Sequence, residues 1–279
     1  MEPPFPPFVP DEDEAVPATN GQPRLRDIPL RVIFPNVLTL LAIASGLTAI
    51  RFAIENRPEM AIGAIILAAV LDGIDGRVAR FLKSTSRFGA QMDSLADFVN
   101  FGVAPGMIIY FTFLGEIRTP GWIAVIVYAI CACLRLARFN VQLDQPKSAP
   151  WRNDFFTGVP APAGAMVVLL PAYLSLLGVE ITGELAWITA IFSGLVGMLM
   201  VSNLPTYSGK TLGSRIPSNI ALPVIIGLVL VVALLLSYPW QVLTALALIY
   251  LASIPWSMYY FNRLAAREAS GEMDEEKGA

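Results

Sequence analysis

Long apolar runs are the feature that most constrains this chain of 279 residues. A helix needs about 20 mostly apolar residues to cross a bilayer. Eight stretches of that kind can be placed, at 35–54, 59–81, 90–114, 121–142, 159–178, 185–203, 218–237 and 241–261. Only 15% of the residues are charged, against about 25% in soluble proteins. Because backbone in lipid must satisfy its own hydrogen bonds, we predict an all-α polytopic membrane protein with eight transmembrane helices.

Basic residues are unevenly distributed among the connections between these spans. Eight spans place both termini on one side of the membrane, together with 16 of the 19 Lys and Arg residues. Only Arg51, Arg57 and Arg118 fall on the other side. Lys and Arg accumulate in cytoplasmic connections. We therefore expect both termini to be cytoplasmic, in a protein integral to the cytoplasmic (inner) cell membrane.

The two ends of the chain differ in composition from its middle. Residues 1–28 are rich in proline and acidic residues, which favours a disordered cytoplasmic tail. Residues 263–279 are charged and are expected to form a second cytoplasmic tail. The range between them, 29–262, is the predicted transmembrane catalytic domain.

The absence of histidine narrows the chemistry available to the chain. It excludes His-based zinc sites and any Ser-His or Cys-His catalytic pair. A general base must then be a carboxylate, a lysine or a tyrosine. The two cysteines, Cys131 and Cys133, lie in an apolar run and imply no disulfide framework.

Four aspartates flank the connection between the second and third spans. Asp72 and Asp75 are three residues apart, and Asp93 and Asp97 are four apart, so each pair lies on one face of its helix. Like charges about 4 Å apart repel by roughly 4 kcal/mol at an effective dielectric constant of about 20. Oxygen ligands without Cys or His suit Mg²⁺ or Mn²⁺. We therefore predict two divalent cations, whose charges would balance the four carboxylates.

Ion pairing at the membrane surface is the competing explanation for these acids. The basic residues available for it are Arg77, Arg80, Lys83 and Arg87. Interleaved glycines favour a ligand site instead, because Gly76 and Gly89 leave room for a close approach. Arg80 and Ser86 can donate hydrogen bonds to phosphate oxygens.

The same segment resembles the signature of the CDP-alcohol phosphotransferase family, Asp-x2-Asp-Gly-x2-Ala-Arg-x8-Gly-x3-Asp-x3-Asp. The matching positions are Asp72, Asp75, Gly76, Ala79, Arg80, Gly89, Asp93 and Asp97. The resemblance implies a membrane enzyme that cleaves the pyrophosphate of a CDP-linked lipid or alcohol and releases CMP. It also implies a homodimer and a core of six helices, here extended by two.

Site roles follow from this resemblance, position by position. Asp72, Asp75 and Asp93 are expected to bind a first metal ion. Asp93 would bridge to a second ion, and Asp97 would complete that site and deprotonate the acceptor hydroxyl. The positions expected to contact the CDP-lipid are Asn36, Thr39, Gly76, Arg80 and Ser86.

Four further segments resemble the bacterial and archaeal phosphatidylserine synthase branch of the family. They are DSLADFVNFGVAP, LRLARFN, FFTGVPAPAGA and LMVSNLPTYSGK. The resemblance implies CDP-diacylglycerol and L-serine as substrates, and phosphatidylserine and CMP as products, by two-metal in-line displacement. The serine carboxylate needs a cation, for which Lys83, Arg135 and Arg138 are the candidates.

Two alternatives remain open at this level. The same chemistry with glycerol-phosphate or inositol-phosphate as acceptor would require several basic residues near the metal ions. A divalent-cation transporter would place the carboxylates near the bilayer midplane, with access from both sides. We expect membrane lipids as surroundings and no nucleic-acid partner.

Overall fold

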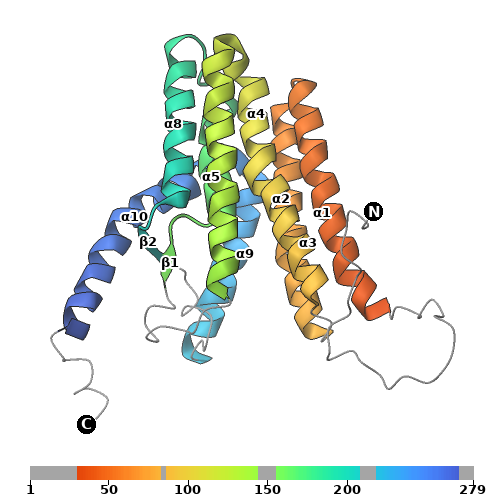
Figure 1. Cartoon of the computed structure of the whole chain (residues 1–279), viewed down its shortest axis with the longest axis vertical. Helices are drawn as coiled ribbons and strands as arrows, with labels where there is room; N and C mark the ends of the chain where they lie inside the picture. The colour runs from red at the N-terminus through yellow and green to blue at the C-terminus, as the bar shows by residue number, and fades with distance from the viewer. Residues whose placement is uncertain (1–29, 83–85, 144–154, 208–217, 270–279) are drawn as a thin grey trace, which may run out of the picture.

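The computed structural model describes residues 30–82, 86–143, 155–207 and 218–269, and helices dominate this part of the chain (Figure 1). The first four helical segments in chain order are α1 (Leu30–Ile54), α2 (Pro58–Phe81), α3 (Arg87–Asp97) and η2 (Phe98–Val103). They are followed by α4 (Ala104–Thr112), η3 (Leu114–Ile117), α5 (Thr119–Leu143), α6 (Ala161–Val168) and α7 (Leu170–Leu176). The chain continues with α8 (Glu184–Val201), α9 (Ser218–Ser237) and α10 (Pro239–Ala269).

Each of the eight predicted spans falls on helix within these residues. Five helices are long and apolar enough to cross a membrane: Ile33–Ile54, Phe88–Thr112, Thr119–Gln142, Glu184–Val201 and Pro239–Glu268. Two shorter apolar helices lie at Ala161–Leu176 and Leu222–Ser237. The prediction of a helical membrane protein is confirmed.

The structure describes part of one predicted tail and none of the other. Residues 1–28 lie outside the described part of the chain. At the other end α10 continues to Ala269, so the described part of the range 263–279 is helical.

Helices α1 and α2 run side by side, and the continuous helical segment formed by α3, η2 and α4 packs against both (Figure 1). Small residues make the close approach possible, as is common in membrane helix pairs. The fully or almost fully buried alanines are Ala42, Ala49 and Ala53 on α1, and Ala61 and Ala68 on α2. Side chains such as Leu40 and Leu47 point outward from α1 and present an apolar surface suited to lipid.

A π-helical turn, η2, lies between α3 and α4 and joins them into one continuous helical segment. A π turn widens the helix by one residue and is frequent at functional sites. Tyr128 on α5 is fully buried, and its hydroxyl donates a 2.7 Å hydrogen bond to the carbonyl oxygen of Phe101 within this turn. That bond satisfies a backbone group at the irregular turn and ties α5 to η2.

A two-stranded antiparallel sheet joins distant parts of the sequence, which the all-α prediction missed. Strand β1 (Phe155–Thr157) pairs with β2 (Pro205–Tyr207), with Phe155 opposite Tyr207. Gly158 follows β1 with φ +76°, and a Cβ there would collide with the Met200 carbonyl oxygen. Three-residue strands show no alternation that could distinguish them from loops.

The contact between α1 and η2 can be tested at Gly46. A Cβ at this position would collide with Oδ1 of the buried Asn100, so we expect Gly46→Ala to destabilise the protein by about 1–3 kcal/mol. Gly63→Ala on α2 is the matched control, because nothing lies within 4 Å of a Cβ there. Thermal unfolding in detergent would measure both. Equal melting temperatures for the two variants would contradict this packing.

Candidate active site

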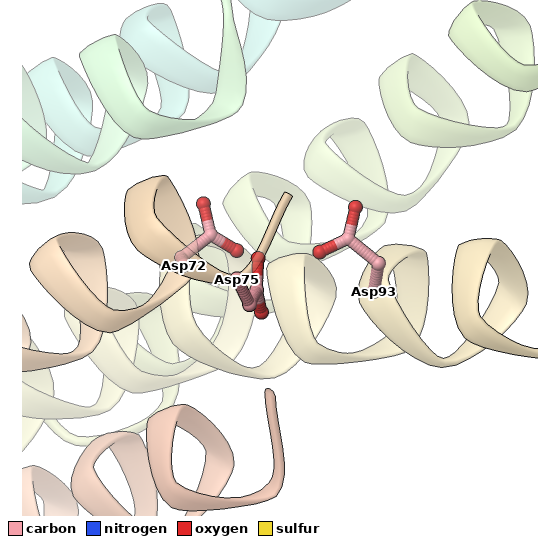
Figure 2. Close-up of side chains that lie close together, drawn as sticks. All are labelled: Asp72, Asp75 and Asp93. Atoms are coloured by element: carbon pink, nitrogen blue, oxygen red, sulfur yellow. The ribbon is translucent and has the colours of Figure 1, made fainter. Parts of the chain in front are cut away.

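Three of the predicted carboxylates converge where α2 ends and α3 begins. Figure 2 shows Asp72 and Asp75 on α2 facing Asp93 on α3. One carboxylate oxygen of each residue lies within 4.8 Å of those of the other two. An antiparallel arrangement of the two helices brings the two faces together, as their sequence spacing predicted. The donors are all hard oxygens, so the group fits a Mg²⁺ or Mn²⁺ ion.

Asp75 is the most enclosed of the three, with 3% of its surface exposed. The Thr39 hydroxyl on α1 donates a 2.7 Å hydrogen bond to Asp75 Oδ2. The same hydroxyl is 3.2 Å from the Pro35 carbonyl oxygen. Because a hydroxyl has only one proton, it donates mainly to the carboxylate, which is the closer and charged acceptor. Thr39 therefore orients Asp75 from the neighbouring helix.

Asp97 lies one helical turn beyond Asp93 on α3. Its carboxyl group interacts with the carboxyl groups of Asp72 and Asp93 and with the guanidinium of Arg135 on α5. It does not belong to the group of three converging oxygens. Asp97 therefore has both the acidic cluster and a buried guanidinium as neighbours.

One observation that does not depend on the family resemblance fits a cation at this site. Asp72 Oδ1 is buried and accepts no hydrogen bond within the described structure. A buried carboxylate oxygen without a partner is costly, and a cation would satisfy it.

Surface ion pairing with Arg77 or Arg80 does not account for the acids. Within the described part of α1 and α2, Glu55 forms ion pairs with Arg51 and Arg57 at the other end of the helices. Neither Arg77 nor Arg80 pairs with an aspartate among the described residues, and the Arg80 Nε donates to the Gly76 carbonyl oxygen at 3.1 Å.

A pocket of about 260 Å³ adjoins the carboxylates. All five positions predicted to contact the CDP-lipid line it, together with Asp75 and Asp93. The remaining lining residues are Pro35, Ala79, Gly89 and Ala90. Segments from α1, α2 and α3 thus enclose one space, which connects the predicted nucleotide-contacting residues with the predicted metal ligands.

The start of α3 contributes a positive helix end to this pocket. Ser86 is its N-cap and accepts a 3.0 Å hydrogen bond from the Gly89 backbone N–H. A Cβ at Gly89 would lie 3.3 Å from Asn36 Oδ1 and 3.2 Å from Ser86 Oγ, so glycine permits the close packing of α3 on α1. At Gly76 a Cβ would meet nothing within 4 Å, and the missing side chain leaves space beside the pocket. A helix N-terminus beside open space is suited to phosphate.

The three cations predicted to bind the acceptor have different surroundings. Arg135 is 7% exposed and lies near Asp97, with its guanidinium carbon 5.2 Å from the centre of the Phe139 ring. Arg138 instead donates hydrogen bonds to the Val201 carbonyl oxygen at 2.8 Å and to Asn203 Oδ1 at 3.0 Å. The first of these gives a partner to a backbone carbonyl at the C-terminal end of α8. Lys83 lies outside the described residues.

Comparison with known proteins assigns the chain to a family. A family model described as CDP-alcohol phosphatidyltransferase matches residues 32–199, more than half of the sequence. The chain belongs to the CDP-alcohol phosphatidyltransferase family. A second model, described as CDP-alcohol phosphatidyltransferase 2, matches residues 219–255. The resemblance found in the signature residues is thereby confirmed.

Relatives of this family member come from distant organisms and share one name, CDP-diacylglycerol–serine O-phosphatidyltransferase. The relative from Mycobacterium leprae is 40% identical over 88% of this chain and 81% of its own length. The relative from Helicobacter pylori strain 26695 is 37% identical over 62% of this chain and 70% of its own. The relative from Methanocaldococcus jannaschii is 33% identical over 64% of this chain and 77% of its own.

Sequence reasoning missed two tyrosines near the site of this family member. Tyr128 holds the π turn that follows Asp97. Tyr250 on α10 lies next to Arg135, although 115 positions separate them in the numbering. Both residues occupy apolar helices, where a tyrosine is as typical of an interfacial belt as of a site, so no signal in the sequence distinguished them.

Cation binding can be measured without reference to any reaction. We expect Asp75→Asn and Asp93→Asn each to weaken Mn²⁺ binding to the purified protein by about tenfold or more, because each removes a charged ligand. Glu59→Gln is the control, since this exposed acid lies on the same helix, ~24 Å from Asp75 at about 1.5 Å per residue. Electron paramagnetic resonance of free Mn²⁺ would report the affinities. Wild-type binding by the Asp93→Asn variant would contradict the site.

Proposed function

We propose that the protein transfers the phosphatidyl group of CDP-diacylglycerol to the hydroxyl of L-serine, yielding phosphatidylserine and CMP. The observation that carries this proposal is the pocket beside the three carboxylates, lined by every position expected to contact the CDP-lipid. The names of the relatives support the choice of substrates.

The pocket suits the polar part of a CDP-lipid. Its volume of about 260 Å³ is below the roughly 300–1,000 Å³ of pockets that enclose a whole drug-sized ligand. The cytidine diphosphate would bind against α1, the N-terminus of α3 and the Arg80 side chain, while the acyl chains remain among the apolar outer surfaces of the helices.

The reaction requires charge neutralisation and a base. Asp72, Asp75 and Asp93 would hold one divalent cation, and Asp93 and Asp97 a second. Such cations, when bound, neutralise the pyrophosphate oxygens and favour departure of CMP. Asp97 accepts the proton of the serine hydroxyl as its oxygen forms a bond to the lipid-side phosphorus. The bond from that phosphorus to the bridging oxygen breaks, and CMP leaves with that oxygen.

Arg135 is the best supported partner for the serine carboxylate. It is buried and lies beside Asp97, so one acceptor molecule can reach both groups. Arg138 is engaged at the end of α8, which favours a structural role for it.

Placement in the membrane forms part of the proposal. Eight crossings, with both termini and the pocket on the cytoplasmic side of the inner cell membrane, follow from the distribution of Lys and Arg. Thiol labelling of single cysteines placed near Arg57 and near Arg263 would test this orientation. The family resemblance also supports a homodimer, which cross-linking in membranes would test.

The reaction itself gives the central test. Purified protein supplied with CDP-diacylglycerol, Mn²⁺ and L-serine should release CMP and form phosphatidylserine, and glycerol-phosphate or inositol-phosphate should not replace serine. We expect Asp97→Asn to lower turnover by about 10²-fold or more, because it removes the base. Glu184→Gln, an exposed acid at the start of α8, is the control. CMP release that is independent of serine would overturn the proposal, and an active Asp97→Asn variant would remove Asp97 from the role of base.

The acceptor site can be tested by comparing the two described arginines. We expect Arg135→Ala to raise the serine KM by about tenfold or more, because a charge-assisted contact with the carboxylate is lost. Arg138→Ala should lower the melting temperature and leave the serine KM within about twofold of wild type. Steady-state kinetics with varied serine would measure both, and an unchanged KM for Arg135→Ala would exclude its carboxylate role.

A further inference from the structure

A buried polar region outside the acidic cluster lies where α5, β2 and α10 meet. Arg135 of α5 has two polar neighbours in this region, the carboxyl group of Asp97 on α3 and the phenol hydroxyl of Tyr250 on α10. The guanidinium also packs over Phe139. A guanidinium has five donors in a planar fork that matches a carboxylate, so Arg135 is suited to bind an anionic ligand here.

The Tyr250 hydroxyl is buried and has no hydrogen-bond partner among the described residues. Thr206 of β2 lies beside it. The Thr206 hydroxyl donates its own proton to the Gly158 carbonyl oxygen at 2.7 Å and keeps acceptor lone pairs, but its contact with the Tyr250 hydroxyl does not have the geometry of a hydrogen bond. A buried hydroxyl without a partner is unfavourable, and it calls for a ligand that accepts a hydrogen bond.

The position of Tyr250 is maintained by contacts of α10 with the small sheet. The Ser257 hydroxyl donates a 2.8 Å hydrogen bond to the Pro205 carbonyl oxygen at the start of β2. Since α10 also packs on α6 and α7, the tyrosine is presented by a rigid element rather than by a mobile loop.

We propose that Tyr250 completes the acceptor subsite by donating its hydroxyl proton to the carboxylate that Arg135 binds. The inference rests on the proposed function and adds the chemical class of the acceptor. One guanidinium and one neutral hydroxyl match a singly charged carboxylate, whereas a doubly charged phosphate calls for further cations. The acceptor is therefore a small hydroxy-carboxylic acid that spans from Arg135 and Tyr250 to the base, Asp97.

Tyr250 lies far in sequence from the signature residues. It belongs to the segment 219–255, which the second family model matches, so α10 is part of the family-related chain rather than an unrelated extension. Acceptor recognition would then depend on a helix outside the region that carries the metal ligands.

Tyr250→Phe tests the inference with the loss of a single oxygen atom. We expect the serine KM to rise about 10- to 100-fold, the range for one hydrogen bond to a charged group. The KM for CDP-diacylglycerol and the kcat should stay within about twofold. Tyr259→Phe on the same helix is the matched control, because Tyr259 is 65% exposed; its kinetics should equal those of wild type. L-serinamide keeps the hydroxyl but lacks the carboxylate, so it should be a poor acceptor for the wild-type protein. Its KM should rise less on Tyr250→Phe than the KM for serine does.

Two results would overturn the inference while leaving the proposed function intact. One is a serine KM for Tyr250→Phe that equals wild type. The other is a lower melting temperature and lower kcat with unchanged discrimination between serine and serinamide, which would show a structural role. If wild-type protein forms no phosphatidylserine from serine at all, the proposed function itself fails, and that result is recognised before any variant is compared.

Discussion

Carboxylates held close together, with no ion pair to Arg77 or Arg80 in the described part of the chain, are the constraint on which the rest of this structure depends. Asp72, Asp75 and Asp93 converge within 4.8 Å, and the described arginines near them form no ion pair with them. Their mutual repulsion would separate α2 from α3 unless other contacts opposed it. The close packing of α1 against both helices supplies those contacts, and a bound cation would remove the repulsion.

Each helix around the acidic cluster contributes a different group to the site. α1 orients Asp75 through Thr39 and lines the pocket with Asn36. α3 contributes its N-terminus to the same pocket and carries Asp97 toward α5. Arg135 then connects this side of the site with α10. A CDP-lipid and a small acceptor would thus approach the metal ligands from different helices, which is what a direct transfer between two substrates requires.

Much of the site was predictable because helical spacing is a local property. Residues three or four apart lie on one helix face, so the pairing of the aspartates followed from the sequence, and the lining of the pocket agrees with the positions carried over from the family. The role of Arg138 was not predictable, since its partners are backbone and side-chain oxygens at the end of α8. The π turn and the two short strands also escaped prediction, because their hydrogen bonds depend on distant residues.

The sequence by itself determined the helices, the acidic pairs and the family. Apolar length, residue spacing and a fixed signature are all properties of neighbouring residues. Only the tertiary structure decided which arginine lies beside Asp97, and it alone placed Tyr250 beside Arg135. The physical reason is that such contacts depend on how helices pack. Packing is governed by small residues at helix contacts, such as Gly46 and Gly89, whose effect appears only when the opposing side chains, Asn100 and Asn36, are in place.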